Sequence, residues 1–224
     1  MAVLAEGAVD LAVEDLRRPG KQMKNIDTKK IEEAIRIAEA GTTGEVVVQI
    51  VPRSDSYLPL TFVWGVSGAL IGSAYAMTVW GSFLEFQVLG AVGGLVFSQV
   101  PSLRRLSLPK KWAAFRVHRE VLANFTALGL HQTREHTGIL LYISWFERRV
   151  EILADSGIHA KLGDSYWSAQ VSDIVQGIRS GRPTEGICQA VREMGEKLAT
   201  HFPGRRENPN ELSDTVQLGP KDTV

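Results

Sequence analysis

The 224-residue chain has one cysteine, no excess of charge of either sign, and none of the short motifs of several common enzyme classes. Cys188 excludes an internal disulfide and a metal site built from several thiolates, and this usage is typical of a reducing compartment. Lys and Arg together number 25, as do Asp and Glu, so overall charge does not favour nucleic acid as a partner. No G-x-x-x-x-G-K-[ST], G-x-G-x-x-G or G-x-S-x-G pattern is present.

Charge is almost absent from one long stretch. Between Asp55 and Arg104 the only charged residue is Glu85. An apolar run of this length is about twice the roughly 20 residues that a helix needs to cross the hydrocarbon core. Glu85 lies near its middle, close to a Gly-Ser pair, so we predict a transmembrane helical hairpin over residues 57–103, with spans at 60–80 and 83–103. The alternative is a buried helical hairpin in a soluble core.

Small residues recur every four positions in both predicted spans. Gly68 and Gly72 do so in the first span, and Gly90 and Gly94 in the second. Such stripes let helix backbones approach closely in lipid. They allow the two spans to pack against each other, or to build a homo-oligomer or a contact with another membrane protein, and the pattern does not distinguish these.

Basic residues follow the second span, whereas the turn between the spans has none. Because Lys and Arg stay on the cytoplasmic side, both ends of the hairpin should emerge there, in the inner membrane of the cell. The same residues suit anionic lipid head groups. These membrane-proximal residues are Arg104, Arg105, Lys110 and Lys111.

A hairpin returns the chain to the side that it left, so residues 26–56 and 104–203 can form one α/β domain. Hydrophobic periodicity predicts helices at 28–40, 110–128, 166–176 and 184–201, and a short helix or turn at 158–162. Apolar, β-branched runs predict strands at 45–51, 139–145 and 149–154, the last two as an antiparallel hairpin with one partly exposed face. Residues 1–25 are expected to be flexible or weakly helical, and 204–224 disordered.

Several of these residues also carry a family resemblance. Thr43-Gly44-Glu45 opens the first strand, Thr137-Gly138 opens the second, Asp155-Ser156-Gly157-Ile158 ends the hairpin, and Asn208-Pro209-Asn210-Glu211-Leu212 lies in the tail. Over about 26–203 the sequence resembles the TPM domain family, in its branch of bacterial membrane proteins. The resemblance implies an α/β/α sandwich with a small mixed β-sheet. It also implies either acid phosphatase activity with divalent-cation binding or a role in assembling and maintaining membrane complexes.

Four carboxylates are the candidate metal ligands. The resemblance implies an acidic residue at Asp155, and hard cations such as calcium or magnesium require several oxygens at one point. Asp164, Glu45 and Asp55 are the other candidates. The alternative is that Asp155 caps a turn and that Glu45 and Asp164 are solvated.

Two hypotheses therefore follow. The first is a membrane-anchored, non-catalytic interaction or accessory module that acts in the assembly or maintenance of membrane complexes. The alternative is a divalent-cation-dependent acid phosphatase. We favour the first because an active site requires convergent titratable groups, and the sequence alone does not assemble one.

Overall fold

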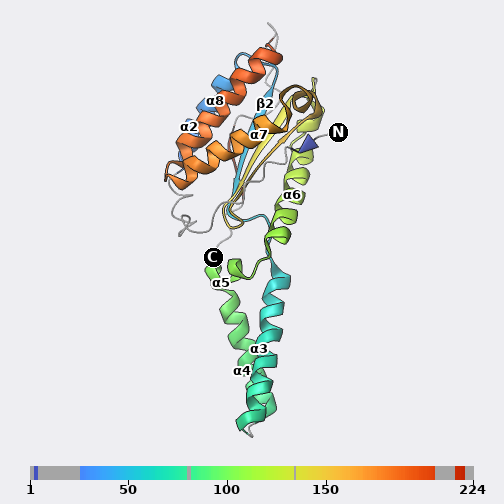
Figure 1. Cartoon of the computed structure of the whole chain (residues 1–224), viewed down its shortest axis with the longest axis vertical. Coiled ribbons are helices and arrows are strands. Elements are labelled where there is room, and N and C mark those ends of the chain that lie inside the picture. Colours follow the sequence, from blue (N-terminus) through green and yellow to red (C-terminus); the bar gives the residue numbers. More distant parts are fainter. Residues whose placement is uncertain (1–2, 5–25, 80–81, 134, 205–214, 220–224) are drawn as a thin grey trace. The chain divides into compact units, whose positions relative to one another are not determined.

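The computed structural model describes residues 3–4, 26–79, 82–133, 135–204 and 215–219 (Figure 1). The described chain divides into two compact units. The α/β unit contains Met1–Ser54 and Arg116–Val224, and the hairpin unit contains Asp55–Phe115. Most of the N-terminal segment 1–25, the turn at Gly81 and the motif 208–212 lie outside the described residues, so those predictions stay predictions.

The α/β unit is built on a mixed sheet in the order β1-β4-β3-β2-β5. Its central strands are β2 (Glu45–Val51), β3 (Gly138–Ser144) and β4 (Arg149–Ala154). β2 runs parallel to β3, and β3 pairs with β4 in an antiparallel hairpin with Ser144 opposite Arg149. The predicted small mixed sheet and its hairpin are confirmed.

The two edge strands come from segments that were expected to lack strands. β1 (Val3–Leu4) pairs antiparallel with β4, and β5 (Gln217–Leu218) pairs parallel with β2. The prediction was wrong at these positions because each strand has only two residues, too few for a periodic pattern to identify.

Helices cover both faces of the sheet (Figure 1). One face packs against α2 (Thr28–Glu39), α7 (Ser156–Arg179) and α8 (Pro183–His201) in a large aliphatic core. The other face packs against α6 (Lys110–Ala127), from Val117 onwards, and the 3-10 helix η1 (Leu130–Gln132). This is the predicted α/β/α layering.

The helix ends follow local rules that the sequence makes visible. Asp27 caps α2 by accepting a hydrogen bond from the backbone N–H of Lys30, at 3.3 Å. α7 was predicted as two shorter pieces, whereas it runs from Ser156 with a break at Gly163. There the backbone is left-handed, with φ of 71°, a conformation that glycine adopts without steric cost. The sequence therefore predicted a break in this region, but it did not predict the full length of α7.

The two faces of the sheet differ in polarity. Alternate residues of β2, β3 and β4 that face α2, α7 and α8 are aliphatic. On the face toward α6, Tyr142, Ser144, Arg149 and Glu151 accompany the aliphatic residues. We predicted that the face of Arg149 and Glu151 would be partly exposed. Instead only 6% of the Glu151 side chain and 11% of the Arg149 side chain are exposed, because α6 covers this face and His118 and Arg149 pair with Glu151.

The hairpin unit contains α3 (Leu58–Val79), α4 (Phe83–Ser98) and α5 (Pro101–Leu106). Among the described helices, α3 alone is long and apolar enough to cross a membrane, and α4 is apolar but shorter. The second span was predicted to continue to 103, and this was wrong. The chain leaves the helical conformation at Val100 and restarts at Pro101, whose ring is accepted at the first turn of a helix but not in its interior.

The glycine stripes form the contact between α3 and α4. A Cβ atom added to Gly68 would overlap the carbonyl oxygen of Gly90, and one added to Gly90 would overlap that of Gly68. Gly72 approaches the carbonyl oxygen of Phe86, and Gly94 that of Trp64, equally closely. Of the alternatives left open by the sequence, the structure therefore uses the stripes to pack the two helices against each other.

Candidate functional site

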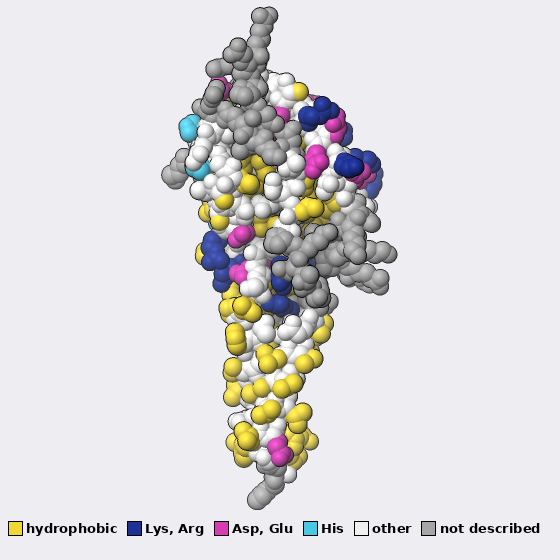
Figure 2. Space-filling model, turned by 180° about the vertical axis from the view of Figure 1, so that it is seen from behind, with side chains coloured by type: hydrophobic (Ala, Val, Ile, Leu, Met, Phe, Trp, Pro, Cys, Tyr) yellow, Lys and Arg dark blue, Asp and Glu magenta, His cyan; other side chains and the backbone are white. Residues whose placement is uncertain are grey.

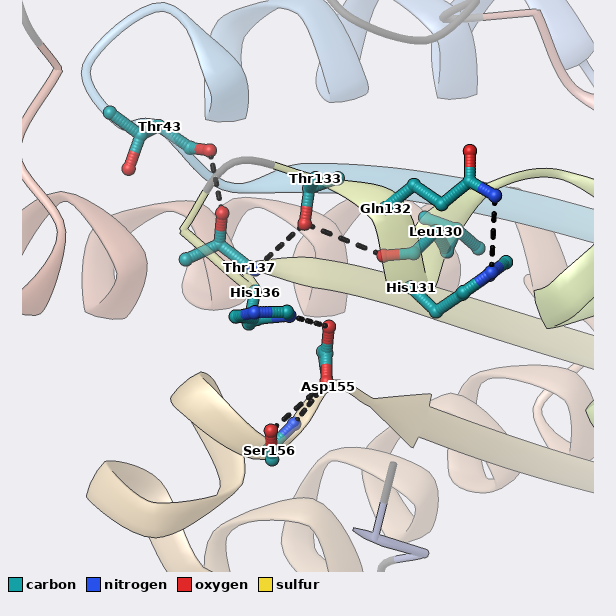
Figure 3. A network of polar contacts seen from close by, with 9 residues as sticks. All are labelled: Thr43, Leu130, His131, Gln132, Thr133, His136, Thr137, Asp155 and Ser156. Carbon is teal, nitrogen blue, oxygen red and sulfur yellow. Dashed lines mark hydrogen bonds and ion pairs between the residues drawn. The ribbon is translucent and has the colours of Figure 1, made fainter. Parts of the chain in front are cut away.

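A buried carboxylate and an exposed imidazole meet at one end of the central strands (Figure 3). Asp155 directly follows β4 and caps α7 by accepting a hydrogen bond from the backbone N–H of Ser156, at 2.6 Å. Its second carboxylate oxygen lies 3.2 Å from Nδ1 of His136. The Asp155 side chain is 3% exposed and that of His136 is 63% exposed, so the pair presents an oriented imidazole to solvent.

Backbone geometry holds this pair in place. The antiparallel register of β3 and β4 puts Asp155 beside Gly138, whose carbonyl accepts the Asp155 N–H at 2.9 Å. His136 has a left-handed backbone with φ of 55°, which is uncommon for a residue with a side chain. A Cβ atom on Gly157 would lie 2.7 Å from the His136 carbonyl oxygen, so only glycine permits this approach.

Hydroxyl groups tie the same loop to β2. The Thr137 hydroxyl donates to the carbonyl oxygen of Thr43 at 2.8 Å, and the Thr133 hydroxyl accepts from the Thr137 N–H at 3.0 Å (Figure 3). The Thr43 hydroxyl donates to the Glu135 carboxylate at 2.8 Å. The Thr-Gly pairs that open both strands therefore stabilise the loop that carries His136.

Chemically, Asp155 and His136 form a pair in which the buried carboxylate orients the exposed ring through its Nδ1 atom. The sequence does not reveal this contact, because the two residues are 19 positions apart and meet only through the strand register.

Three of the four predicted metal ligands belong to the α/β unit, and these three do not come together. Asp155 caps α7, Glu45 is buried at the start of β2, and Asp164 is 68% exposed with its carboxylate 3.4 Å from Nε2 of His159. Asp55 belongs to the hairpin unit, where it accepts from the Tyr57 N–H. Throughout the described residues no three His, Cys, Asp or Glu side chains lie together as a metal site requires. Asp155, Glu45 and Asp164 therefore form no common cluster in the described part of the α/β unit, and metal binding stays a prediction.

A second polar cluster lies at the opposite end of β2 and β3. The Ser54 hydroxyl lies 3.2 Å from the Tyr142 hydroxyl and 3.0 Å from that of Ser144. Glu147 accepts from the Ser54 N–H at 3.0 Å and also from the Ser144 hydroxyl. Burial raises the pKa of Tyr142, and the nearby carboxylates raise it further, so this phenol stays protonated. The cluster lies at the end of the sheet from which the chain continues into the hairpin unit.

Glu151 is the most perturbed carboxyl group of this face. Burial raises its pKa, and the positive charges of Arg149 and His118 oppose that shift. The Arg149 Nε atom lies 3.4 Å and the His118 Nδ1 atom 3.6 Å from its oxygens. Alternation of polar and apolar residues in β4 signalled a polar face, but which helix would cover it cannot be read from a strand pattern.

The predicted membrane-proximal basic residues lie at the base of the hairpin unit. Arg104 and Arg105 occupy the last turn of α5, and Lys110 and Lys111 begin α6. The Arg104 guanidinium donates to the carbonyl oxygen of Ser56, just before α3. This contact ties the chain that enters the hairpin to the chain that leaves it.

Comparisons with known proteins agree with this architecture. The sequence model of the TPM domain family matches residues 99–197, from the end of α4 into α8. The NMR structure of the BA42 protein from the psychrophilic bacteria Bizionia argentinensis sp. nov. is similar, with a TM-score of 0.56 and 18% sequence identity. The similarity covers 87% of this chain and 96% of BA42, and at this identity it shows a shared fold alone. No curated protein matched the sequence.

Proposed function

Residues 99–197 are a TPM domain, and from this premise we propose that the protein is a membrane-anchored accessory module. In this proposal α3 and α4 anchor the chain in the bilayer. The α/β unit then binds a membrane-protein partner during assembly or maintenance of a membrane complex.

The exposed apolar surface of the hairpin carries the proposal. Only 11% of an apolar 18-residue stretch of α3 is buried. Figure 2 shows hydrophobic side chains spread along the visible surface of this part of the chain. A soluble protein rarely exposes a continuous apolar surface larger than a few hundred Å², whereas lipid is the natural environment of one. Exposed large hydrophobic residues on α3 and α4 include Phe62, Val66, Leu70, Ile71, Met77, Leu84, Leu89 and Val96.

Glycine packing supports insertion of α4 together with α3. With 16 residues, α4 is about 24 Å long, shorter than the roughly 30 Å hydrocarbon core. A helix of this length is stable in lipid when it packs against a longer neighbour, and interhelical contact through Gly68 and Gly90 is typical of membrane helices. The basic residues after the hairpin favour a cytoplasmic α/β unit.

The anchoring is tested with a charge placed on the lipid-facing side of α3. Leu70 lies in α3 and is 66% exposed, so Leu70→Asp should disturb insertion without disturbing a protein core. An Asp at the centre of a membrane helix costs about 3 kcal/mol of insertion free energy. We expect the variant to shift from the alkali-resistant membrane fraction to the extractable fraction.

Ile37→Asp is the matched control, because Ile37 is 56% exposed on α2 of the α/β unit. This variant should remain in the alkali-resistant fraction with the parent protein. Extraction of the parent protein itself at alkaline pH would refute the anchoring.

The second candidate function is a divalent-cation-dependent acid phosphatase, supported by the Asp155–His136 pair. Here Asp155 would contribute to a calcium or magnesium site, and His136 would be the residue that transfers a proton in the reaction. Saturable binding of either cation to the full-length protein, measured by calorimetry and lost in Asp155→Ala, supports this function. Absence of binding at millimolar cation, with unchanged phosphatase turnover in Asp155→Ala, excludes Asp155 from it.

A further inference from the structure

A polar cluster lies between α7 and α8, which pack side by side in the α/β unit (Figure 1). Two contacts show that these helices run antiparallel. A Cβ atom on Gly177 would lie 2.8 Å from the Cα atom of Gly186, close to the connecting turn. Equally far beyond it on each helix, the Gln170 amide nitrogen donates to the Glu193 carboxylate at 2.9 Å. Tyr166 precedes Gln170 by one turn of α7, so it lies on the same side, facing α8.

The Gln170 side chain has a buried acceptor without a donor. Gln170 is 4% exposed, and its Oε1 atom has no hydrogen-bond partner among the described residues. Reversing the amide would not satisfy this atom, because the oxygen would then face the Glu193 carboxylate, which only accepts. The Oε1 atom shares its carbon with the nitrogen that contacts Glu193, so it lies beside that carboxylate. Two acceptors next to each other favour a donor from outside the described chain.

The Tyr166 hydroxyl is a second buried polar atom without a partner in the described part of the chain. Burial raises the pKa of this phenol, and the carboxylates of Glu193 and Glu196 raise it further. The hydroxyl therefore stays protonated and lies in the field of both carboxylates. Its oxygen is free to accept a hydrogen bond from a ligand that carries a positive charge.

The carboxylates of this cluster have no cation beside them. The amides of Gln170 and Gln189 donate to Glu193 at 2.9 and 3.0 Å, and these hydrogen bonds lower its pKa, so Glu193 stays ionised. Both donors are neutral. Within the described residues no Lys, Arg or His forms an ion pair with Glu193 or with the exposed Glu196. The negative charge of the cluster is therefore available to a ligand.

The two lysines nearest to the cluster in sequence do not fill it. The Lys161 ammonium lies 4.9 Å from the centroid of the Phe202 ring. Lys197 follows Glu193 by one turn of α8, but it is exposed and forms no ion pair with a described residue.

We propose that the α7–α8 cluster, formed by Tyr166, Gln170, Glu193 and Glu196, binds a basic side chain of a partner protein. A guanidinium or an ammonium group has several N–H donors, so it can donate to Gln170 Oε1 and to the Tyr166 hydroxyl while its charge faces the two glutamates. The inference rests on the proposed function, in which the α/β unit binds a membrane-protein partner. Cytoplasmic loops of membrane proteins carry an excess of Lys and Arg, so such a partner supplies this ligand.

The test uses n-butylguanidinium, which has the head group of an arginine side chain, with n-butanol as the uncharged probe. The full-length protein is held in an uncharged detergent, and the indole N–H signals of its tryptophans are followed by NMR. Trp167 reports on the cluster, because its ring meets that of Tyr166 edge to face at 5.1 Å and its buried Nε1 atom has no partner among the described residues. Its signal is assigned from Trp167→Phe. We expect millimolar n-butylguanidinium to shift this signal saturably and n-butanol to leave it in place.

Variants assign the binding to the cluster. Glu193→Gln removes one charge, and should raise the dissociation constant of n-butylguanidinium by about tenfold or more. Tyr166→Phe removes only the hydroxyl group, and should raise it by about twofold to tenfold. Glu185→Gln is the matched control, because Glu185 is an exposed glutamate in the first turn of the same helix, and it should leave the constant unchanged. The unshifted indole signals of the other tryptophans verify that each variant is folded.

Three results overturn the inference. They are an unshifted Trp167 signal in the parent protein, an equal shift with n-butanol, and an unchanged dissociation constant in Glu193→Gln.

Fractionation of the parent protein separates this inference from the anchoring. A parent protein that resists alkaline extraction and does not bind n-butylguanidinium keeps the membrane anchoring and refutes the cation site alone. A parent protein that binds the probe but is extracted at alkaline pH keeps the cation site and refutes the membrane-anchored function on which the choice of partner rests.

Discussion

Replacement of single glycines in α4 should separate the effect of the close contact between α3 and α4 from the effect of helix propensity. Gly90 and Gly93 lie in the same helix, three residues apart, but a Cβ atom on Gly90 would overlap the carbonyl oxygen of Gly68, whereas one on Gly93 would meet nothing within 4 Å. Gly90→Ala and Gly93→Ala are therefore chemically identical changes with opposite steric consequences.

The magnitudes follow from the two environments. Backbone atoms cannot rotate away as a side chain can, so α3 and α4 must move apart in Gly90→Ala, at a cost of about 1–3 kcal/mol. Gly93→Ala has only the change in helix propensity, which favours Ala by up to about 1 kcal/mol in water. Gly90→Ala should thus destabilise the hairpin and Gly93→Ala should leave it unchanged or slightly more stable.

The assay is unfolding of the hairpin by SDS in mixed micelles, followed by energy transfer between two labels. Val66 and Val92 are exposed positions on α3 and α4 that accept the labels as cysteines, in a Cys188→Ala background. Equal stabilities of the two glycine variants would show that the close backbone contact between α3 and α4 does not hold the hairpin together.

Three further predictions concern the α/β unit. Burial raises the pKa of Glu151, so the folded state favours the protonated acid. This preference contributes to the stability of the fold below the unfolded pKa of about 4.3. The contribution is lost as pH rises through the higher folded pKa. Glu151→Gln should therefore gain stability relative to the parent protein as pH rises, as urea unfolding at pH 4 and pH 8 will measure. Asp155→Ala removes the cap of α7 and the partner of His136, and should lower the unfolding free energy by about 1–3 kcal/mol, with Asp155→Asn, which keeps an acceptor, in between. Because burial raises the pKa of the Cys188 thiol, maleimide should modify it only after unfolding, as mass spectrometry across a urea series will show.

Local patterns predicted the parts of the fold that local physics determines. Hydrophobic periodicity predicted the helix α2, and the β-branched run at 45–51 predicted the strand β2. The Thr-Gly pairs, the β3–β4 hairpin and the glycine stripes were also visible, because each depends on neighbours in sequence or on a regular spacing.

Features that depend on tertiary contact were not visible in the same way. Nothing in the strand pattern of β4 indicates that α6 covers Glu151, and the contact of His136 with Asp155 requires the register of β3 and β4. The two-residue strand β5 forms only because β2 presents an edge to it. The early end of α4 could have been predicted from Pro101, because proline breaks a helix when it lies in the interior.

The central claim is that the hairpin crosses the membrane and returns, and labelling of single cysteines from outside the cell tests it most directly. Ser82 is exposed at the hairpin turn, its side chain makes no capping bond, and Lys29 is exposed on α2. In a Cys188→Ala background, a membrane-impermeant maleimide should label Ser82→Cys in intact cells and Lys29→Cys only after permeabilisation. Labelling of both positions only after permeabilisation would contradict the crossing, and labelling of Lys29→Cys in intact cells would contradict the orientation.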